Sequence, residues 1–263
     1  MPELPEVEYA ARIARAACAG KTIATVRTLH PSLQRALPND HAQSLAGDVV
    51  VAVARRGKHQ LFHLGSGRTL HVHFRMTGDW RVGSCDTPPH RVTRVLFEFA
   101  DGTQLALDDS RALATVTLHE AGIDPCPALG PDATDDRFDA AWLQAQLTGR
   151  RTPIKSALLD QRVVAGIGNI YASEALWYAR VDPRRLGYRL TPRQCVAIVA
   201  GVKRAMHRAL AHPERYYGAE GISAAVRFNA YDREGKGCRR CRTAVSRIVQ
   251  AGRSSYFCRE CQR

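Results

Sequence analysis

The chain has 263 residues, a length that allows one large domain or two smaller ones. Its residues are 45% hydrophobic and 24% charged, and no stretch approaches the ~20 apolar residues of a membrane helix, so we expect no membrane insertion. Lysine and arginine total 38 against 25 acidic residues, and the net charge of +13 favours nucleic acid as the partner over a merely basic enzyme.

The first twenty residues carry early acidic side chains and lack the apolar core of a secretion signal. We therefore expect a cytoplasmic protein in a reducing compartment, where cysteines remain thiols or bind metal.

The N-terminal half is predicted to be a helix followed by β-strands. Residues 3 to 17 place Val7, Ala11 and Ala14 at helical spacing. From Thr22 to about Val116 short β-type runs dominate, and their turns at Gly65-Ser66-Gly67 and Asp101-Gly102 predict antiparallel hairpins. This pattern favours a sandwich or barrel with a flanking helix. The clearest strand segments are 49–53, 60–64, 69–74 and 95–99.

A segment rich in proline, glycine and aspartate, residues 121–136, predicts a linker between domains. The helices expected after it are FDAAWLQAQL, Pro153 to Asp160, Tyr171 to Tyr178 and Pro192 to Leu210. Thr152 and Thr191 each precede a proline, which is typical of an N-cap followed by the first helical residue.

Two CxxC pairs lie near the C-terminus, with sixteen residues between them. Such pairs predict a tetrahedral zinc site, which should be structural because four thiolates leave no open position. Disulfides are the alternative, which a reducing compartment disfavours. The four other cysteines are expected to be ordinary core or surface residues. The predicted ligands are Cys238, Cys241, Cys258 and Cys261, with Arg242, Arg247, Arg253 and Tyr256 on a basic hairpin between them.

The segment VVAGIGNIYASE, residues 163–174, joins a glycine turn to the expected start of a helix at Asn169. A helix N-terminus offers N–H groups to an anion such as phosphate, although glycine before a helix is more often plain punctuation. At the other end of the chain, trimming of Met1 would expose the secondary amine of Pro2 beside Glu3. Such an amine can attack a sugar carbon and form an iminium, whereas the alternative is a frayed terminus.

These motifs occur in one order along the chain, together with Lys58 in its loop, and resemble those of the formamidopyrimidine-DNA glycosylase and endonuclease VIII family. The resemblance implies an α+β multidomain fold: an N-terminal β-sandwich with a flanking helix, a helix-two-turn-helix domain and a C-terminal zinc finger. The corresponding boundaries are 1–120 for the sandwich, 121–136 for the linker, 137–230 for the helical domain and 231–263 for the finger.

The same resemblance implies a catalytic role for three residues. Pro2 corresponds to the family nucleophile that attacks C1′, Glu3 to the acid that opens the sugar ring and shuttles protons, and Lys58 to a lysine that contacts the phosphate beside the lesion. Glu6 is expected to brace the active site, although a solvated carboxylate on a helix is the alternative.

Further residues are expected to bind DNA around a nucleotide flipped out of the helix. Asn169 and Arg253 match phosphate-gripping residues of the family, and Lys155 matches a lysine close to the lesion. Met76 and Arg111 match side chains that fill the space left by the flipped base, and Leu113 stands where an aromatic wedge is typical.

The sequence therefore predicts a base-excision-repair enzyme, a DNA glycosylase with abasic-site lyase (β/δ-elimination) activity acting through a Schiff base at Pro2. Its expected partner is double-stranded DNA with oxidised bases or abasic sites, its cofactor one structural Zn²⁺, and its state a monomer in the cytoplasm of a bacterial-type cell, associated with the nucleoid. Expected substrates are formamidopyrimidines, hydantoins and oxidised pyrimidines, with 8-oxoguanine as a further candidate, because the stretch from His212 to Arg227 looks too short for the usual lid. The competing hypotheses are a non-catalytic zinc-finger protein that binds damaged or bent DNA and, more remotely, a zinc-ribbon RNA-binding protein.

Overall fold

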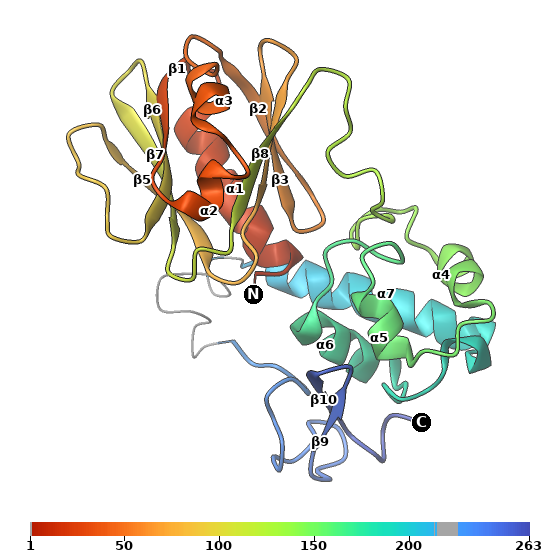
Figure 1. Ribbon diagram of the computed structural model, residues 1–263. Helices are drawn as coiled ribbons and strands as arrows, with labels where there is room; N and C mark the ends of the chain where they lie inside the picture. Colours follow the sequence, from red (N-terminus) through yellow and green to blue (C-terminus); the bar gives the residue numbers. More distant parts are fainter. Residues whose placement is uncertain (1, 213, 215–225) are drawn as a thin grey trace. The chain divides into compact units, whose positions relative to one another are not determined.

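The protein is described by a computed structural model that covers residues 2–212, 214 and 226–263 (Figure 1). Its contacts divide it into two compact units, one made of Pro2 and Glu6–Pro127 and the other of Glu3–Pro5 and Ala128–Arg263. The boundary at Pro127 falls inside the predicted linker. The first residues of the chain therefore contribute to both units.

The first unit is an antiparallel β-sandwich. One sheet has the strand order β1-β6-β7-β5 and the other β2-β3-β4-β8, and Figure 1 shows them as two layers. The predicted hairpin turns are confirmed, because 65–67 joins β3 to β4 and 101–102 joins β6 to β7. The strands are β1 (Ile23–Thr28), β2 (Val50–Arg56), β3 (His59–Leu64), β4 (Thr69–His73), β5 (Gly78–Ser84), β6 (Thr93–Phe99), β7 (Thr103–Asp109) and β8 (Thr115–His119).

Aromatic side chains hold the two sheets together. Phe62 on β3 lies 5.5 Å from Trp80 and 6.5 Å from Phe97 between ring centroids, and both partners belong to the other sheet. All three rings are buried, so apolar area removed from water stabilises the layered arrangement.

The predicted first helix is confirmed as α1 (Leu4–Cys18), which buries Val7, Ala11 and Ala14 along one face. The short helices α2 (Pro31–Gln34) and α3 (Asn39–Gln43) were not predicted, since segments this short carry too few turns for a periodic pattern.

The second unit contains the predicted helices, which are α4 (Ala140–Leu147), α5 (Ile154–Leu159), α6 (Asn169–Ala179) and α7 (Pro192–Leu210), with a short 3-10 turn η1 (Gly187–Arg189). Their apolar faces share one core with Leu4 and Phe138. Thr191 caps α7 as predicted, and its hydroxyl and Gln194 form a reciprocal capping box. No helix in the described residues is long and apolar enough to cross a membrane.

Two sequence-based details were wrong. Thr152 is not an N-cap, because α5 begins at Ile154 after Pro153, and Pro153 instead pairs with Leu186 in an isolated β-bridge. The linker is shorter than predicted, because Ala133 is fully buried in the core of the second unit and Asp132 pairs with Ala165.

The C-terminal segment forms the predicted hairpin from β9 (Ser246–Gln250) and β10 (Arg253–Phe257). Its two-residue turn puts Ala251 at φ 47° and Gly252 at φ 72°. Positive φ at both positions is the geometry that matches the twist of paired strands.

Gly201 is the point of closest approach between α6 and α7. A Cβ atom at this position would lie 2.4 Å from the carbonyl oxygen of Ala175. We predict that Gly201→Ala destabilises the protein by about 1–3 kcal/mol, although alanine is the better helix former, because the two helices must separate. Urea unfolding measures this, with the exposed Val196→Ala on the same helix as control. Equal or higher stability of Gly201→Ala would contradict the packing described.

Candidate active site and zinc centre

The carboxylate of Glu3 is seated on the N-terminus of α6. Its Oε2 accepts hydrogen bonds from the backbone N–H groups of Gly168 at 2.6 Å and Tyr171 at 3.3 Å, and its Oε1 accepts one from Ile170 at 2.8 Å. The side chain is 2% exposed. These N–H groups lack partners within the helix, and the helix dipole favours a negative charge here.

The turn before α6 requires glycine because the N-terminal segment of the chain passes very close to it. A Cβ atom on Gly168 would lie 2.4 Å from the Glu3 carboxyl carbon, and one on Gly166 would lie 2.6 Å from the Leu4 side chain. Gly166 also has φ +99°, and its carbonyl accepts the Leu4 N–H at 3.0 Å. The sequence left two interpretations of this helix end open, an anion site and plain punctuation; in the structure the anion on these N–H groups is the carboxylate of Glu3.

Lys155 is enclosed by acceptors of the second unit. Its Nζ donates to Asn169 Oδ1 at 2.7 Å, to the carbonyl of Ser254 at 2.6 Å and to Ser255 Oγ at 2.8 Å. Burial lowers the pKa of Lys155 to about 8, with Glu3 opposing the shift and Arg253 adding to it. The sequence led us to expect direct contact between Lys155 and DNA. In this structure the Lys155 side chain is 1% exposed, so it is not accessible for such a contact. The lysine instead connects α5, α6 and the finger hairpin.

Asn169 is the first residue of α6, and its side chain has two hydrogen-bond partners. Its Oδ1 accepts from Lys155, and its side chain hydrogen-bonds the phenol of Tyr231, where it opposes the rise in pKa that burial causes in that tyrosine. Arg253 is exposed at the start of β10, directly before Ser254, whose carbonyl holds Lys155. The second unit therefore brings Glu3, Lys155, Asn169 and the Arg253 strand together.

Glu174 is a structural anchor that the sequence did not reveal, although it closes the motif containing Asn169. Its buried carboxylate accepts the consecutive backbone N–H groups of Asn229, Ala230 and Tyr231 at 2.8 to 3.0 Å. This fixes the chain before the finger and places Tyr231 against Asn169. The sequence gives no periodic sign of such a contact, because the partners lie 55 residues apart.

In the first unit, Lys58 lies in the two-residue turn Gly57-Lys58 between β2 and β3. Gly57 has φ 59°, and Arg55 braces the turn by donating to the Gly57 carbonyl at 3.0 Å and to Glu8 at 2.9 Å. Lys58 is only 6% exposed, which differs from a solvated surface lysine. Pro2 is also buried, next to Glu3 in the chain.

Glu6 lies in the first turn of α1 and is 4% exposed. This burial is inconsistent with the alternative of a solvated helix carboxylate.

Two loops carry the residues expected to fill the gap left by a flipped base. Met76 and Leu113 are 38% and 42% exposed, and Arg111 is exposed as well. Large apolar side chains displayed on loop tips are suited to contact a partner surface.

Asp109, which the sequence reasoning also missed, anchors both loops. Its carboxylate accepts from the Thr77 hydroxyl in one loop, and from the backbone N–H groups of Arg111 at 3.1 Å and of Leu113 and Ala114 at 2.7 Å in the other. Asp109 is 1% exposed, so these interactions form away from water and fix the two loops to each other.

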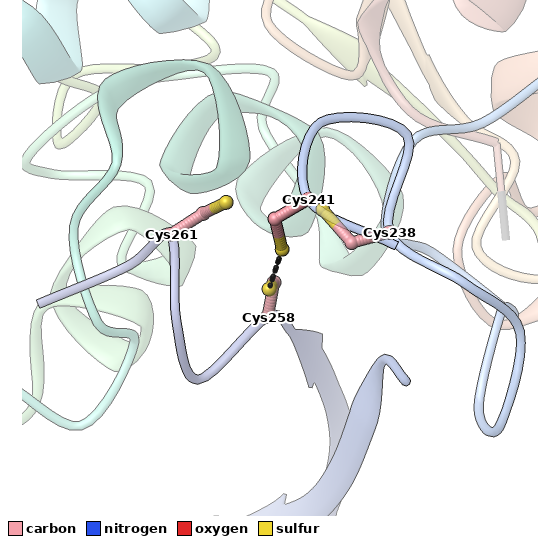
Figure 2. Close-up of side chains that lie close together, drawn as sticks. All are labelled: Cys238, Cys241, Cys258 and Cys261. Atoms are coloured by element: carbon pink, nitrogen blue, oxygen red, sulfur yellow. Dashed lines mark hydrogen bonds between the residues drawn. The ribbon is translucent and has the colours of Figure 1, made fainter. Parts of the chain in front are cut away.

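The four predicted zinc ligands come together in the finger (Figure 2). Their sulfur atoms all lie within 4.8 Å of one another, and Cys241 Sγ is 3.4 Å from Cys258 Sγ. Tetrahedral zinc with Zn–S near 2.3 Å separates its sulfurs by about 3.8 Å, so the cluster fits the ion. Trp177 and Ala230 pack with Cys238 and Cys258 and link the finger to α6.

The lid expected from His212 to Arg227 lies almost entirely outside the described residues, which include only His212, Glu214, Val226 and Arg227 from this stretch.

Three family models match the chain. They are the formamidopyrimidine-DNA glycosylase N-terminal domain over residues 1–116, the formamidopyrimidine-DNA glycosylase H2TH domain over 129–217, and the zinc finger found in FPG and IleRS over 235–263.

Curated relatives match over the full chain. The formamidopyrimidine-DNA glycosylase of Cereibacter sphaeroides is 40% identical over 283 residues, covering 100% of both chains, and that of Bacillus subtilis is 34% identical, covering 100% of this chain and 99% of its own. A crystal structure of the Lactococcus lactis Fpg bound to DNA containing N7-benzyl-Fapy-dG superposes with a TM-score of 0.91 at 27% identity over 100% of both chains. The chain therefore belongs to the formamidopyrimidine-DNA glycosylase family, and is a base-excision-repair DNA glycosylase and abasic-site lyase with one structural zinc ion.

Proposed function

We propose that Pro2, with Met1 removed, is the nucleophile and that Glu3 handles the protons of the reaction. The main support for this assignment is that the Glu3 carboxylate accepts hydrogen bonds from the N–H groups of Gly168 and Ile170. These bonds fix a carboxylate one residue from the Pro2 amine. The Pro2 nitrogen bonds to C1′ as the glycosidic bond breaks, and the bonding electron pair leaves with the base, which takes a proton from solvent. The Glu3 carboxylate accepts the proton that the Pro2 nitrogen loses and passes it to the sugar ring oxygen as the ring opens, which leaves the iminium. The resulting iminium is the electron sink for elimination of the phosphate.

The residues that hold the DNA backbone are proposed to be Lys58, Asn169 and Arg253. The support is the placement of their groups: an asparagine amide held by Lys155, an arginine exposed on a rigid hairpin turn, and a lysine in a braced turn. Lys155 acts as a positioning residue that orients Asn169 and the hairpin. The charge contacts offset the few kcal/mol that flipping a nucleotide costs.

Glu6 is proposed to brace the active site. Met76, Arg111 and Leu113 are proposed to fill the space vacated by the flipped nucleotide. Their exposure on loops that Asp109 fixes supports this role, because a wedge must be rigid to hold bases apart.

The proposed substrates are formamidopyrimidines, hydantoins and oxidised pyrimidines in double-stranded DNA. Structures of the similar Lactococcus lactis protein contain Fapy-dG and oxidised-pyrimidine DNA, which supports this range. The relatives come from bacteria, which supports a bacterial-type enzyme. We further propose that it acts as a monomer on the nucleoid in the cytoplasm, with a β/δ-elimination lyase step. We also propose that the helix-two-turn-helix domain spans residues 137–230 and the zinc finger residues 231–263.

Sodium borohydride should trap a covalent complex between the protein and abasic-site DNA through Pro2, because the iminium is reducible. Pro2→Gly should lose most of the trapped complex, by at least about tenfold if an activated secondary amine is required. Peptide mapping of the wild-type adduct should place it on the N-terminal peptide. An adduct on a lysine, or unchanged trapping by Pro2→Gly, would refute the assignment.

Gly168→Ala should lower base excision by about 100-fold, because a Cβ atom there displaces Glu3 from its N–H donors and small misplacements of catalytic groups are costly. Single-turnover excision rates measure the effect. The matched control is Gly83→Ala on β5, where a Cβ atom meets nothing closer than 3.6 Å. Wild-type rates in Gly168→Ala would show that the seat of Glu3 is dispensable.

Asp109→Ala should destabilise the first unit by about 1–3 kcal/mol, because several hydrogen-bond donors would lose their acceptor. It should slow excision from duplex DNA more than nicking of a preformed abasic site, because intact lesions depend more on the gap-filling loops. The exposed Asp86→Ala serves as control. Equal slowing of both reactions would argue against a role in flipping.

Ring-opened and saturated lesions should be excised faster than 8-oxoguanine, because they have lost stacking and cost less to extrude. A panel of single-lesion duplexes under single-turnover conditions tests this. A clear preference for 8-oxoguanine opposite cytosine would overturn the substrate order.

A further inference from the structure

The outer face of the β2-β3-β4-β8 sheet carries an unusual row of histidines. His59 pairs directly with His73 across β3 and β4, and His71 lies beside Thr117 of β8 in register. Side chains of alternate residues share one face of a strand, so these imidazoles project to the same side, away from the aromatic core. The five histidines on this face are His59, His63, His71, His73 and His119.

Two of these imidazoles converge on a cysteine from the chain segment that follows β8. His59 Nδ1 lies 2.6 Å from His71 Nε2, and Cys126 Sγ lies 3.8 Å from the same nitrogen. All three potential ligand atoms lie within 4.8 Å of one another, and Cys126 is 5% exposed.

These separations are close to those around a tetrahedral transition-metal ion. With metal–nitrogen bonds near 2.0 Å and a metal–sulfur bond near 2.3 Å, ligand nitrogens sit about 3.3 Å apart and nitrogen and sulfur about 3.6 Å apart. An ion would therefore require the two imidazoles to separate by about 0.7 Å, a shift that side-chain rotation supplies.

Surrounding groups hold two of the three ligands, His71 and Cys126, in this orientation. His71 Nδ1 faces Thr117 Oγ1 at 3.5 Å, and that hydroxyl contacts His119 Nε2 at 2.9 Å, so Thr117 occupies the His71 nitrogen that points away from the cluster. The Cys126 backbone N–H donates to Asp124, which in turn pairs with Arg56. Outer hydrogen bonds of this kind fix the tautomer and the direction of metal ligands.

We propose that His59, His71 and Cys126 form a second metal site, separate from the finger, that takes a zinc-class divalent ion with a water in the fourth position. Binding replaces the thiol proton, which is released to solvent, by a metal–sulfur bond. Two nitrogens and one sulfur match the preference of zinc over magnesium or calcium. The ion would fasten residues 124–127, where the chain leaves the sandwich, to strands β3 and β4. This site is independent of the proposed glycosylase chemistry.

The expectation that Cys126 is an ordinary core or surface residue is revised by this proposal. Both Cys126 and Cys18 are buried, but only Cys126 is grouped with two imidazole nitrogens among the described residues.

The test is the zinc content of the full-length protein after loading with Zn²⁺ and removal of excess by gel filtration. Wild type should retain two zinc ions, whereas Cys126→Ser and His71→Gln should each retain one. Two matched controls, His63→Gln on the same sheet face and the exposed Cys85→Ser, should retain two. Cys258→Ser, which disrupts the finger, should still retain the ion on the sandwich.

Loading with Co²⁺ gives a second readout that does not depend on stoichiometry. The difference between the cobalt spectra of Cys258→Ser and of the Cys258→Ser, Cys126→Ser double variant should show cobalt–thiolate absorption from a single sulfur, about a quarter of the intensity of the four-thiolate finger, because the remaining finger cysteines contribute equally to both. A wild-type protein that retains only one zinc ion, or Cys126→Ser and His71→Gln proteins that both retain two, would overturn the proposal.

Discussion

The contact between the Glu3 carboxylate and the N-terminus of α6 is the constraint on which the site depends. The segment Glu3–Pro5 belongs to the second unit, whereas Pro2 and the remainder of α1 belong to the first. A carboxylate on three backbone N–H groups is a charge-assisted arrangement that needs no other side chain. It explains why glycine is required at positions 166 and 168, where any side chain would meet Leu4 or Glu3.

Buried polar groups elsewhere position the exposed residues that we propose to contact DNA. Lys155 holds Asn169 and the strand of Arg253, Glu174 holds the backbone that carries Tyr231, and Asp109 holds two loops of the sandwich. Each of these three groups is at most 5% exposed and has several hydrogen-bond partners. In a low-dielectric interior such networks are rigid, and rigidity is what a nucleotide-flipping surface requires.

The sequence was sufficient to predict the layered fold and the zinc cysteines. Alternating strands, glycine turns and the Thr191 cap are local signals, and two CxxC pairs specify their own geometry. It failed where the partner is remote in the chain. Nothing near Gly168 in the sequence indicates that its N–H group donates a hydrogen bond to Glu3. Asp109 and Glu174 likewise resemble ordinary acidic residues, and only the fold surrounds them with N–H groups.

Lys155 shows that a motif can identify a residue without revealing its contacts. Resemblance to the family identified the residue, but only the fold places its ammonium group on Asn169, Ser254 and Ser255. A motif thus marks which residues matter, whereas burial and hydrogen-bond partners decide what each one touches.

A crystal structure of the borohydride-trapped complex with abasic-site DNA would locate both the covalent bond and the Glu3 carboxylate. We expect a bond between the Pro2 nitrogen and C1′, with the Glu3 carboxylate still accepting hydrogen bonds from Gly168 and Ile170. A covalent bond to any lysine, or a Glu3 side chain that has left the α6 N-terminus in the complex, would contradict it.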